Sequence, residues 1–256
     1  MKTSIVIPYI VPQNGGEELR YALRSIEKNL DFDTKVYIIG EKPEWLTDKA
    51  TFIPTERVNG MDYMVFLDTT SKIYLVSKDK RISQNFVYMY DDTFFINKTS
   101  LEDIQELKCL ENMKDIPSDK WFKTSRASGK WKSLMRKTLA KLQDGGYSIY
   151  NFETHCPRVI NKKKAKEVIE VNNMLIDPLM FSTLYYNVTK ELGEIPRSLV
   201  PWGDGIKLGV YRPFDFETLK GKVKENKFLN YDTTSYNEGM KKLLEHLFAE
   251  KSGFEA

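Results

Sequence analysis

A strand–helix–strand pattern at the start of the chain limits the choice of folds more than any other feature. Ser4–Pro8 is a short run rich in β-branched residues, followed by a loop rich in Pro, Asn and Gly, as expected for a buried strand. Lys35–Gly40 is a second such run. Between them an apolar stripe predicts an amphipathic helix, with Leu19, Ala22, Leu23, Ile26 and Leu30 at steps of three and four. A helical crossover makes the two strands parallel, so the chain is predicted to open a Rossmann-like sheet.

A third strand is predicted at Phe86–Tyr90, directly before Asp91 and Asp92. The segment from Tyr63 to Ser77 has no clear period. Helical periodicity recurs at Ser100–Leu110, Lys130–Leu142, Lys162–Leu175 and Glu238–Phe248. The predicted fold class is therefore α/β, with a mostly parallel sheet flanked by helices and a more helical C-terminal portion.

Composition fits one domain whose basic functions are local. The chain has 256 residues, 41% of them apolar, enough for one core; we expect a single domain over 1–256, with a subdivision into 1–117 and 118–256. The 39 Lys and Arg against 36 Asp and Glu leave +3, which argues against a protein built mainly to coat nucleic acid. The apolar runs fall far below the roughly 20 residues of a membrane-spanning helix.

The expected compartment is the cytoplasm. The N-terminus enters a strand-like run without the pattern of a secretory signal. Cys109 and Cys156 lie in different contexts without C-x-x-C spacing, which favours reduced thiols over a disulfide framework or a zinc site.

Asp91 and Asp92 form a carboxylate pair with apolar neighbours on both sides. Ligands of open α/β sheets bind beyond the carboxyl ends of the strands, where this pair is expected. Adjacent carboxylates in apolar surroundings cost solvation energy unless a cation such as Mg²⁺ or Mn²⁺ satisfies them. The alternative is a loop cap, in which the acids accept hydrogen bonds from the turn.

Arg20 and Arg24 are four residues apart on the predicted first helix, so they are neighbours on its surface. Two guanidinium groups near the carboxyl edge of the sheet could hold phosphate oxygens. The alternative is a solvated face in which Glu17 and Glu27 are their partners.

His155 lies in the Pro-containing segment Glu153–Arg158, away from any predicted helix face. An imidazole near a carboxylate is suited to proton transfer, although a lone histidine is more often structural. His246 lies in an amphipathic segment and is expected to be structural.

Aromatic and basic residues alternate in the stretch Lys120–Lys141, which includes Trp131. Such a stretch could bind single-stranded nucleic acid through phosphates and stacking. It could equally hold a sugar-phosphate acceptor or an anionic membrane surface, or be a solvated helix face.

Ordered blocks along most of the chain resemble the Stealth family, bacterial capsular polysaccharide phosphotransferases related to the animal GlcNAc-1-phosphotransferase. Asn14–Lys28, which reads NGGEELRYALRSIEK, resembles the second block of the family. The later matching segments keep the order of the family: Lys35–Ile39, Pro43–Leu46, Phe86–Phe95, Trp131–Leu134 with Thr154–Pro157, Lys227–Asp232 and Leu247–Glu255. Ser4–Tyr9 instead looks like the first strand of ordinary GT-A glycosyltransferases.

The resemblance implies a GT-A-like fold and a transferase that moves a hexose-1-phosphate from a UDP-sugar to a glycan or other hydroxyl acceptor. It places the donor on residues 1–117 and the acceptor on 118–256. The implied catalytic residues are Asp92, His155 and Arg24; the implied substrate-binding residues are Arg20, Asp91, Arg158 and Trp131; and the implied ligands of Mg²⁺ or Mn²⁺ are Asp91, Asp92 and Asp232. Transfer of the sugar alone stays open, as does a nonenzymatic module that binds nucleic acid or an anionic surface through Lys120–Lys141.

Overall fold

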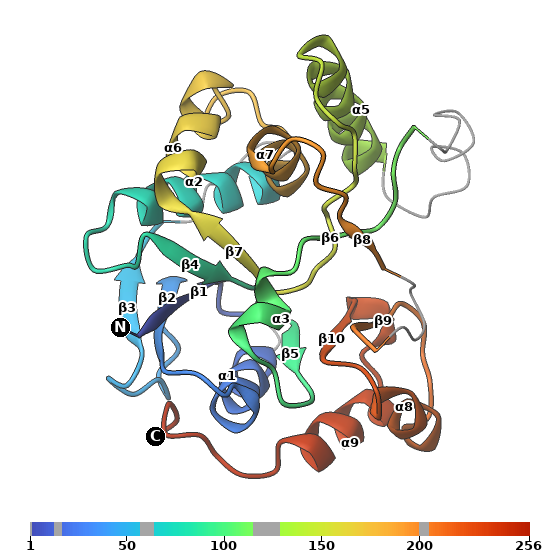
Figure 1. Cartoon of the computed structure of the whole chain (residues 1–256). Coiled ribbons are helices and arrows are strands. Elements are labelled where there is room, and N and C mark those ends of the chain that lie inside the picture. The colour runs from blue at the N-terminus through green and yellow to red at the C-terminus, as the bar shows by residue number, and fades with distance from the viewer. Residues whose placement is uncertain (1, 13–16, 57–63, 115–128, 200–204) are drawn as a thin grey trace.

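A five-stranded sheet organises the molecule. The computed structural model describes residues 2–12, 17–56, 64–114, 129–199 and 205–256 (Figure 1). The sheet has the order β3-β2-β1-β4-β7, and its strands are β1 (Thr3–Tyr9), β2 (Thr34–Gly40), β3 (Thr51–Pro54), β4 (Asn85–Tyr88) and β7 (Arg158–Asn161). The first four run parallel, and β7 is antiparallel to β4 at the edge.

The predicted strand–helix–strand opening is confirmed. Ile5 pairs with Val36 in the parallel register of β1 and β2, and helix α1 (Glu18–Asn29) joins the two strands. The sheet is buried on both sides: Ile5 and Ile7 belong to the core that α1 covers, whereas Val6 belongs to the core on the opposite face. Alternation along a strand sends successive side chains to opposite faces, so a short apolar run serves both cores.

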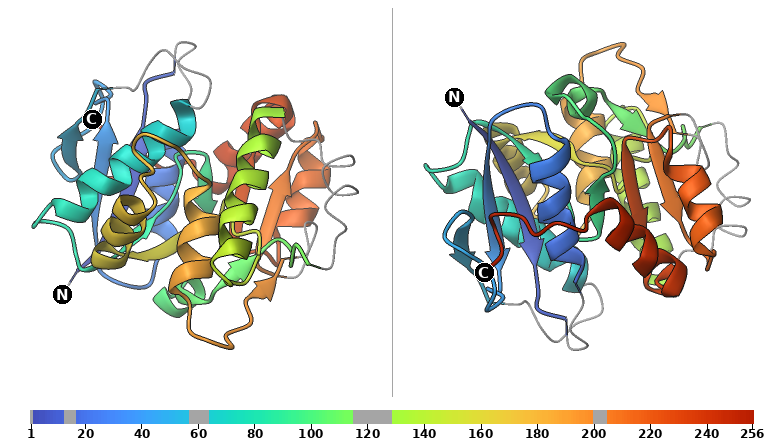
Figure 2. Two further views of the ribbon diagram at one scale, coloured as in Figure 1. Left: turned by 90° about the horizontal axis from the view of Figure 1, so that it is seen from above. Right: turned by 90° about the horizontal axis from the view of Figure 1, so that it is seen from below.

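Helices cover the second face of the sheet (Figure 2). They are α2 (Met64–Lys78), α6 (Lys162–Val171) and α7 (Phe181–Thr189), and α5 (Gly129–Asp144) packs against α7. The segment without a clear period is therefore helix α2. The helix predicted to end at Leu175 ends at Val171, because Asn173 adopts a left-handed φ of 52° and turns the chain.

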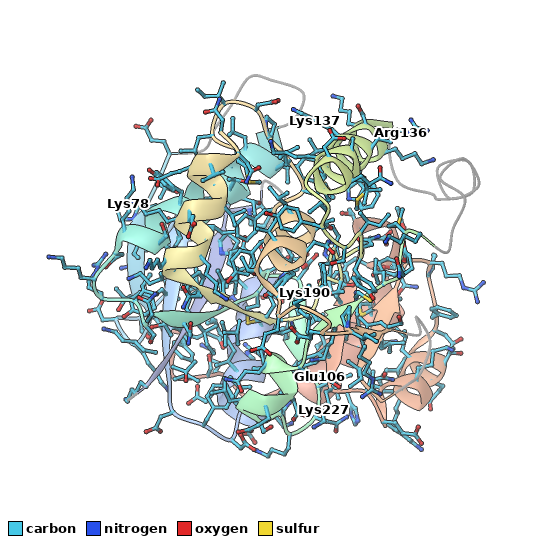
Figure 3. All side chains as sticks on the ribbon, turned by 45° about the horizontal axis from the view of Figure 1, so that its top comes forward. Lys78, Glu106, Arg136, Lys137, Lys190 and Lys227 are labelled. Carbon is cyan, nitrogen blue, oxygen red and sulfur yellow. The ribbon has the colours of Figure 1, made fainter. Side chains whose placement is uncertain are left out.

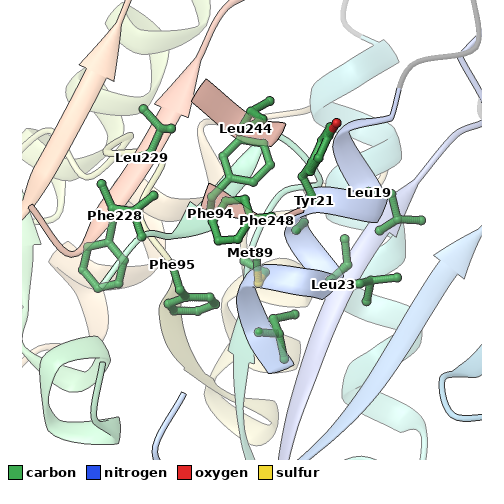
Figure 4. Packing of buried hydrophobic residues seen from close by; sticks show 14 of the residues in the cluster. Leu19, Tyr21, Leu23, Met89, Phe94, Phe95, Phe228, Leu229, Leu244 and Phe248 are labelled. Carbon is green, nitrogen blue, oxygen red and sulfur yellow. The ribbon is translucent and has the colours of Figure 1, made fainter. Parts of the chain in front are cut away.

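A second, three-stranded sheet has the order β5-β10-β9, from β5 (Thr93–Phe95), β10 (Phe228–Tyr231) and β9 (Lys207–Val210). Phe94 stacks on Tyr231 and Phe248, and Phe95 meets Phe228 edge-on, within the core shared with α1 (Figure 4). Helices α8 (Phe216–Val223) and α9 (Glu238–Leu247) pack on each other beside it. This confirms the more helical C-terminal portion.

The helix predicted over Ser100–Leu110 is shorter than expected. Helix α3 spans Leu101–Gln105, capped by Ser100. It stops because β6 (Lys108–Cys109) pairs in parallel with β8 (Arg197–Ser198), a partner far along the chain. A long-range pairing of this kind leaves no trace in local periodicity.

Strands from both sides of residue 118 share both sheets. In the main sheet β7 pairs with β4. In the second sheet β10 lies between β5 and β9 and pairs with both. A subdivision into 1–117 and 118–256 would cut across both sheets, and the single domain stays a prediction.

Gly40 ends β2 where β1 also ends, and a side chain there is predicted to be costly. Its φ is +128°, and an added Cβ would lie 2.1 Å from the carbonyl oxygen of Tyr9. We expect Gly40→Ala to lower the free energy of unfolding by about 3 kcal/mol, measured by urea unfolding. Gly129→Ala is the control, since its added Cβ meets no atom within 4 Å; an equal loss in both variants would contradict the steric argument.

Candidate functional site

The acidic pair lies in the turn that joins the two sheets. β4 ends at Tyr88, and a hydrogen bond from the Thr93 amide to the Tyr90 carbonyl closes the turn at 3.3 Å, just where β5 begins. Met89 donates to the carbonyl of Val6 in β1. Asp91 and Asp92 are therefore fixed at the carboxyl edge of the main sheet, between its two central strands and the second sheet.

The surroundings of both carboxylates disfavour the charged form and raise the pKa values. Burial, and then the neighbouring charge of Asp92, raises the pKa of Asp91 to about 7. Burial raises the pKa of Asp92 to about 6, against the opposing effect of Lys207. The Oδ1 atom of Asp92 is buried and has no hydrogen-bond partner among the described residues. A loop cap would satisfy this oxygen, so the pair is not explained by capping alone.

These observations fit a divalent cation. A hard cation such as Mg²⁺ or Mn²⁺ takes carboxylate oxygens, and it would satisfy the orphaned Oδ1 of Asp92 while removing the repulsion between the two acids. Asp91 and Asp92 are the residues that would hold it.

Asp232 is positioned differently from the expected metal ligand. It follows β10 as the N-cap of the 3₁₀-helix Thr233–Ser235, where its Oδ1 accepts from the Ser235 amide at 3.0 Å and from the Thr234 hydroxyl at 2.8 Å. Within the described ranges, His, Cys, Asp and Glu side chains form no group of three that could hold a metal ion. The expected three-carboxylate shell is thus not assembled.

Two cavities meet at the acidic pair. The larger, of about 320 Å³, and the smaller, of about 210 Å³, are both lined by Asp91 and Asp92. The larger has a lining of apolar and polar side chains, which include Phe66, Trp131, Leu179, Phe181, His155 and Ser182. The smaller is lined by Pro12, Glu18, Tyr231, Thr233 and Tyr236. Asp91 and Asp92 therefore lie between the two cavities, where a ligand in either cavity could contact them.

His155 lines the larger cavity and is kept neutral. Its backbone has a left-handed φ of 51°, a conformation that costs a non-glycine residue about 1–3 kcal/mol. The residue is exposed and lines the cavity, and its ring lies 5.3 Å from that of Tyr90. Desolvation, with the charges of Lys207 and Arg158, lowers the pKa of His155 to about 3. The imidazole is thus a hydrogen-bond acceptor at neutral pH.

Arg158, at the start of β7, contacts two residues that line the larger cavity, Tyr90 and Ser182. Its buried guanidinium donates to Ser182 and Phe152 and lies over the ring of Tyr90 at 5.3 Å. Its Nε and Nη2 atoms have no partner among the described residues. Arg158 does not line the larger cavity itself, so direct contact with substrate stays a prediction.

Arg20 and Arg24 are bound by a carboxylate that the sequence did not suggest. Arg24 makes two hydrogen bonds to Glu255, at 2.8 and 2.7 Å, and one to the Phe248 carbonyl. Arg20 donates to Glu255 at 3.1 Å and lies over the ring of Trp45. Neither arginine lines the cavities at the acidic pair. The expected meeting of the arginine pair with the acidic pair in one pocket is therefore not found.

Three residues of the site were not predicted from the sequence, although Tyr231 lies in the matching segment Lys227–Asp232. Lys207 is buried at the start of β9, where it donates to the Thr154 carbonyl and, at 3.1 Å, to the hydroxyl of Tyr211. Tyr231 and Tyr236 stack with their ring centres 5.4 Å apart and line the smaller cavity. In the sequence, a lysine or tyrosine in a short strand cannot be told from a residue of the core, because only the folded second sheet places it beside the acids.

The mainly parallel sheet flanked by helices, with the acidic pair after β4, has the architecture of the GT-A glycosyltransferase fold. The chain superposes on the galactosyltransferase LgtC, in complex with donor and acceptor sugar analogues, with a TM-score of 0.51 and 12% identity, over 98% of this chain and 96% of that one. It superposes on WbbM, a bifunctional glycosyltransferase, with a TM-score of 0.54 and 12% identity, over 98% of this chain and 50% of that one. These likenesses establish the fold.

Among curated sequences, the chain is similar to the uncharacterized protein L294 of Acanthamoeba polyphaga mimivirus, with 26% identity over 192 residues. The match takes up 75% of this chain but 6% of the viral protein. No family model matches the chain, so the resemblance to the Stealth family stays a prediction. Every helix in the described part of the chain is too short or too polar to cross a membrane.

Glu255 is predicted to stabilise the fold through the two arginines. Burial alone would raise its pKa, but hydrogen bonds from Arg24, Ser252 and Arg20 outweigh it and lower the pKa from 4.5 to about 2. A lowered pKa means that the stabilisation is complete above pH 4.5 and is lost as the pH falls toward 2. We expect Glu255→Gln to lower the free energy of unfolding by about 2–4 kcal/mol at pH 7.

Urea unfolding across the pH range measures this effect. The difference between the two proteins should shrink toward acid pH, where the native carboxylate is protonated as well. Glu250→Gln is the control, because Glu250 is exposed in the same C-terminal segment. A loss in Glu255→Gln that did not change with pH would contradict the assignment.

Proposed function

We propose that this chain is a nucleotide-sugar-dependent transferase that uses Asp91 and Asp92 at the boundary of the two cavities. The single observation that carries the proposal is the half-buried and incompletely compensated carboxylate pair at the carboxyl edge of a GT-A sheet, with a cavity on each side. We place the donor diphosphate next to Asp91 and Asp92, on the cation that they would hold, and the acceptor in the larger cavity.

The lining of the larger cavity supports an acceptor with both apolar and polar faces. The aromatic side chains of Phe66, Trp131 and Phe181 share this lining with the polar side chains of His155 and Ser182. A sugar ring has an apolar face and hydroxyl edges, so a glycan or a similar hydroxyl acceptor suits the cavity.

In the proposed reaction, Asp91 and Asp92 would hold Mg²⁺ or Mn²⁺, which supplies neutralisation of the donor diphosphate. Lys207 adds a fixed positive charge beside Asp92. Neutral His155 accepts a hydrogen bond from the acceptor hydroxyl and orients it; its pKa of about 3 makes it a weak base. As the acceptor oxygen bonds to the sugar, the bond from the sugar to the nucleotide diphosphate breaks, and the acceptor proton passes to an oxygen of the departing diphosphate.

We favour transfer of the sugar alone over transfer of a hexose-1-phosphate. Attack at phosphorus would need several cations around the transferred phosphoryl group. Arg20 and Arg24, which the Stealth resemblance assigns to this work, are bound to Glu255 instead. Hexose-1-phosphate transfer remains the second candidate, since the ordered family blocks favour it.

Nucleotide analysis after incubation with a UDP-sugar, Mn²⁺ and a glycan acceptor mixture tests the proposal. Release of UDP indicates sugar transfer, release of UMP indicates hexose-1-phosphate transfer, and neither nucleotide would refute both. We expect Asp92→Asn to abolish release, because it loses a charge for the cation. Its free energy of unfolding should be unchanged or higher by up to ~3 kcal/mol, since ionising a carboxyl with a raised pKa costs stability. Nucleotide release at the native rate by Asp92→Asn would remove the assignment.

Cation affinity is predicted to depend on pH. A carboxyl must be deprotonated to hold a metal ion, so Mn²⁺ should bind more tightly as the pH rises through the pKa values of about 6 and 7 for Asp92 and Asp91. Calorimetric titration with Mn²⁺ alone measures this. Asp92→Asn should weaken binding at least tenfold, whereas Asp232→Asn, the same change in a helix cap, should not. Equal losses would return Asp232 to the metal shell.

A further inference from the structure

Positive charge is concentrated on two helices on the second face of the sheet. Helices α5 and α6 carry nine Lys and Arg against three Asp and Glu, an excess of six positive charges. The whole chain carries only +3, so the remaining residues are net negative. The basic stretch noted in the sequence extends to Lys120, but residues 115–128 lie outside the described ranges.

Large apolar side chains are exposed at the same end of the molecule. Val171, the last residue of α6, is 76% exposed, and Ile176 is 77% exposed in the turn that follows. The amide of Ile176 donates to the Asn173 carbonyl, which makes the turn tight. An ion pair between Lys137 of α5 and Asp177 holds this turn against the basic helix.

A surface cavity confirms that these elements lie together. It has a volume of about 630 Å³, and its lining includes Lys141 and Tyr147 from α5 and its following loop and Lys164, Val171 and Asn172 from α6 and its end. Asp144 and Glu167 line it as well, so the excess of positive charge comes from the rest of the two helices. Helices α5 and α6 both reach the upper edge of the molecule in Figure 1, and Arg136 and Lys137 lie at the end opposite to Glu106 and Lys227 in Figure 3. We call this surface the basic end: Arg136, Lys137, Lys141, Tyr147, Lys164, Val171 and Ile176.

The basic end is separate from the acidic pair. Its cavity shares no lining residue with the two cavities at Asp91 and Asp92. Helix α5 links them: Trp131 lines the larger cavity near one end of the helix and Lys141 lines the basic end near the other. Ten residues of helix separate these two positions by roughly 15 Å.

We propose that the basic end docks the protein onto an anionic lipid bilayer. Val171 and Ile176 enter the headgroup region as aliphatic anchors, and the surrounding lysines and Arg136 meet the phosphate and serine headgroups. Binding of this kind combines buried apolar area with attraction to anionic lipid. Nucleic acid would also match the charge, but its binding would leave the protruding aliphatic side chains exposed to water.

Co-sedimentation with vesicles tests the proposal. Vesicles of phosphatidylcholine with about one-third phosphatidylserine should bind the full chain, and vesicles of phosphatidylcholine alone should not. Raising the salt concentration should release the protein, because salt screens the attraction. No binding to the anionic vesicles, or equal binding to both kinds, would overturn the proposal.

Substitutions locate the surface. Lys141→Glu should weaken binding to anionic vesicles about tenfold or more, and Ile176→Ser should weaken it without changing the net charge. Lys242→Glu is the matched control: it makes the same charge change on an exposed residue of α9, at the opposite end of the molecule. Equal losses in Lys141→Glu and Lys242→Glu would show a non-specific charge effect and refute the site.

Vesicle binding can be separated from transferase activity. Asp92→Asn, which is expected to lose nucleotide release, should bind vesicles like the native protein. Tighter binding to single-stranded oligonucleotide than to anionic vesicles, with Ile176→Ser unaffected, would assign the basic end to nucleic acid and overturn the lipid proposal.

Discussion

Two adjacent, half-buried carboxylates at the meeting of the two sheets are the constraint around which this molecule is arranged. The cost of burying Asp91 and Asp92 appears directly in their raised pKa values. The fold offsets that cost only in part, through the buried lysine of β9 and the backbone of the turn. An arrangement that leaves an acidic oxygen without a partner is expected at a ligand site, where the missing partner arrives with the ligand.

The turn that bears the acids is also the joint between the two sheets. β4 belongs to the main sheet and β5 to the second, so the short turn between them cannot move without disturbing one of the cores. Phe94 and Phe95 follow the turn and are fully buried between α1 and β10 (Figure 4). This packing pre-organises the carboxylates, and it explains how a short, otherwise irregular segment keeps a fixed geometry.

The C-terminal segment also contributes to that rigidity. It returns to the first helix, where Glu255 accepts hydrogen bonds from both arginines and Gly253 donates to Glu27. The segment thereby ties α9, which packs beside the second sheet, to α1, which packs on the first. A pair of arginines that looked available for phosphate instead links the two halves of the core.

Local periodicity was sufficient to predict the first two strands, the first helix and the location of the acidic pair. Those elements bury a repeating apolar pattern, and such patterns are visible over a few residues. The partners of the arginines could not be predicted, because Glu255 is 231 residues from Arg24 in the chain. Lys207 was missed for a related reason: its contact with Thr154, in a distant loop, exists only in the tertiary fold.

The arginine pair and the acidic pair differ because the folded chain pairs some charged groups with internal partners and leaves others without full compensation. A sequence shows where charged groups occur, but the fold decides which of them are already paired. Arg20 and Arg24 are neutralised within the protein, and His155 is neutral because desolvation by the surrounding protein and the nearby cations disfavour its charged form. Asp91 and Asp92 differ because the compensation that they receive is incomplete. That residual imbalance, rather than the presence of acids as such, is the strongest argument that a cation and its phosphate ligand belong at this edge.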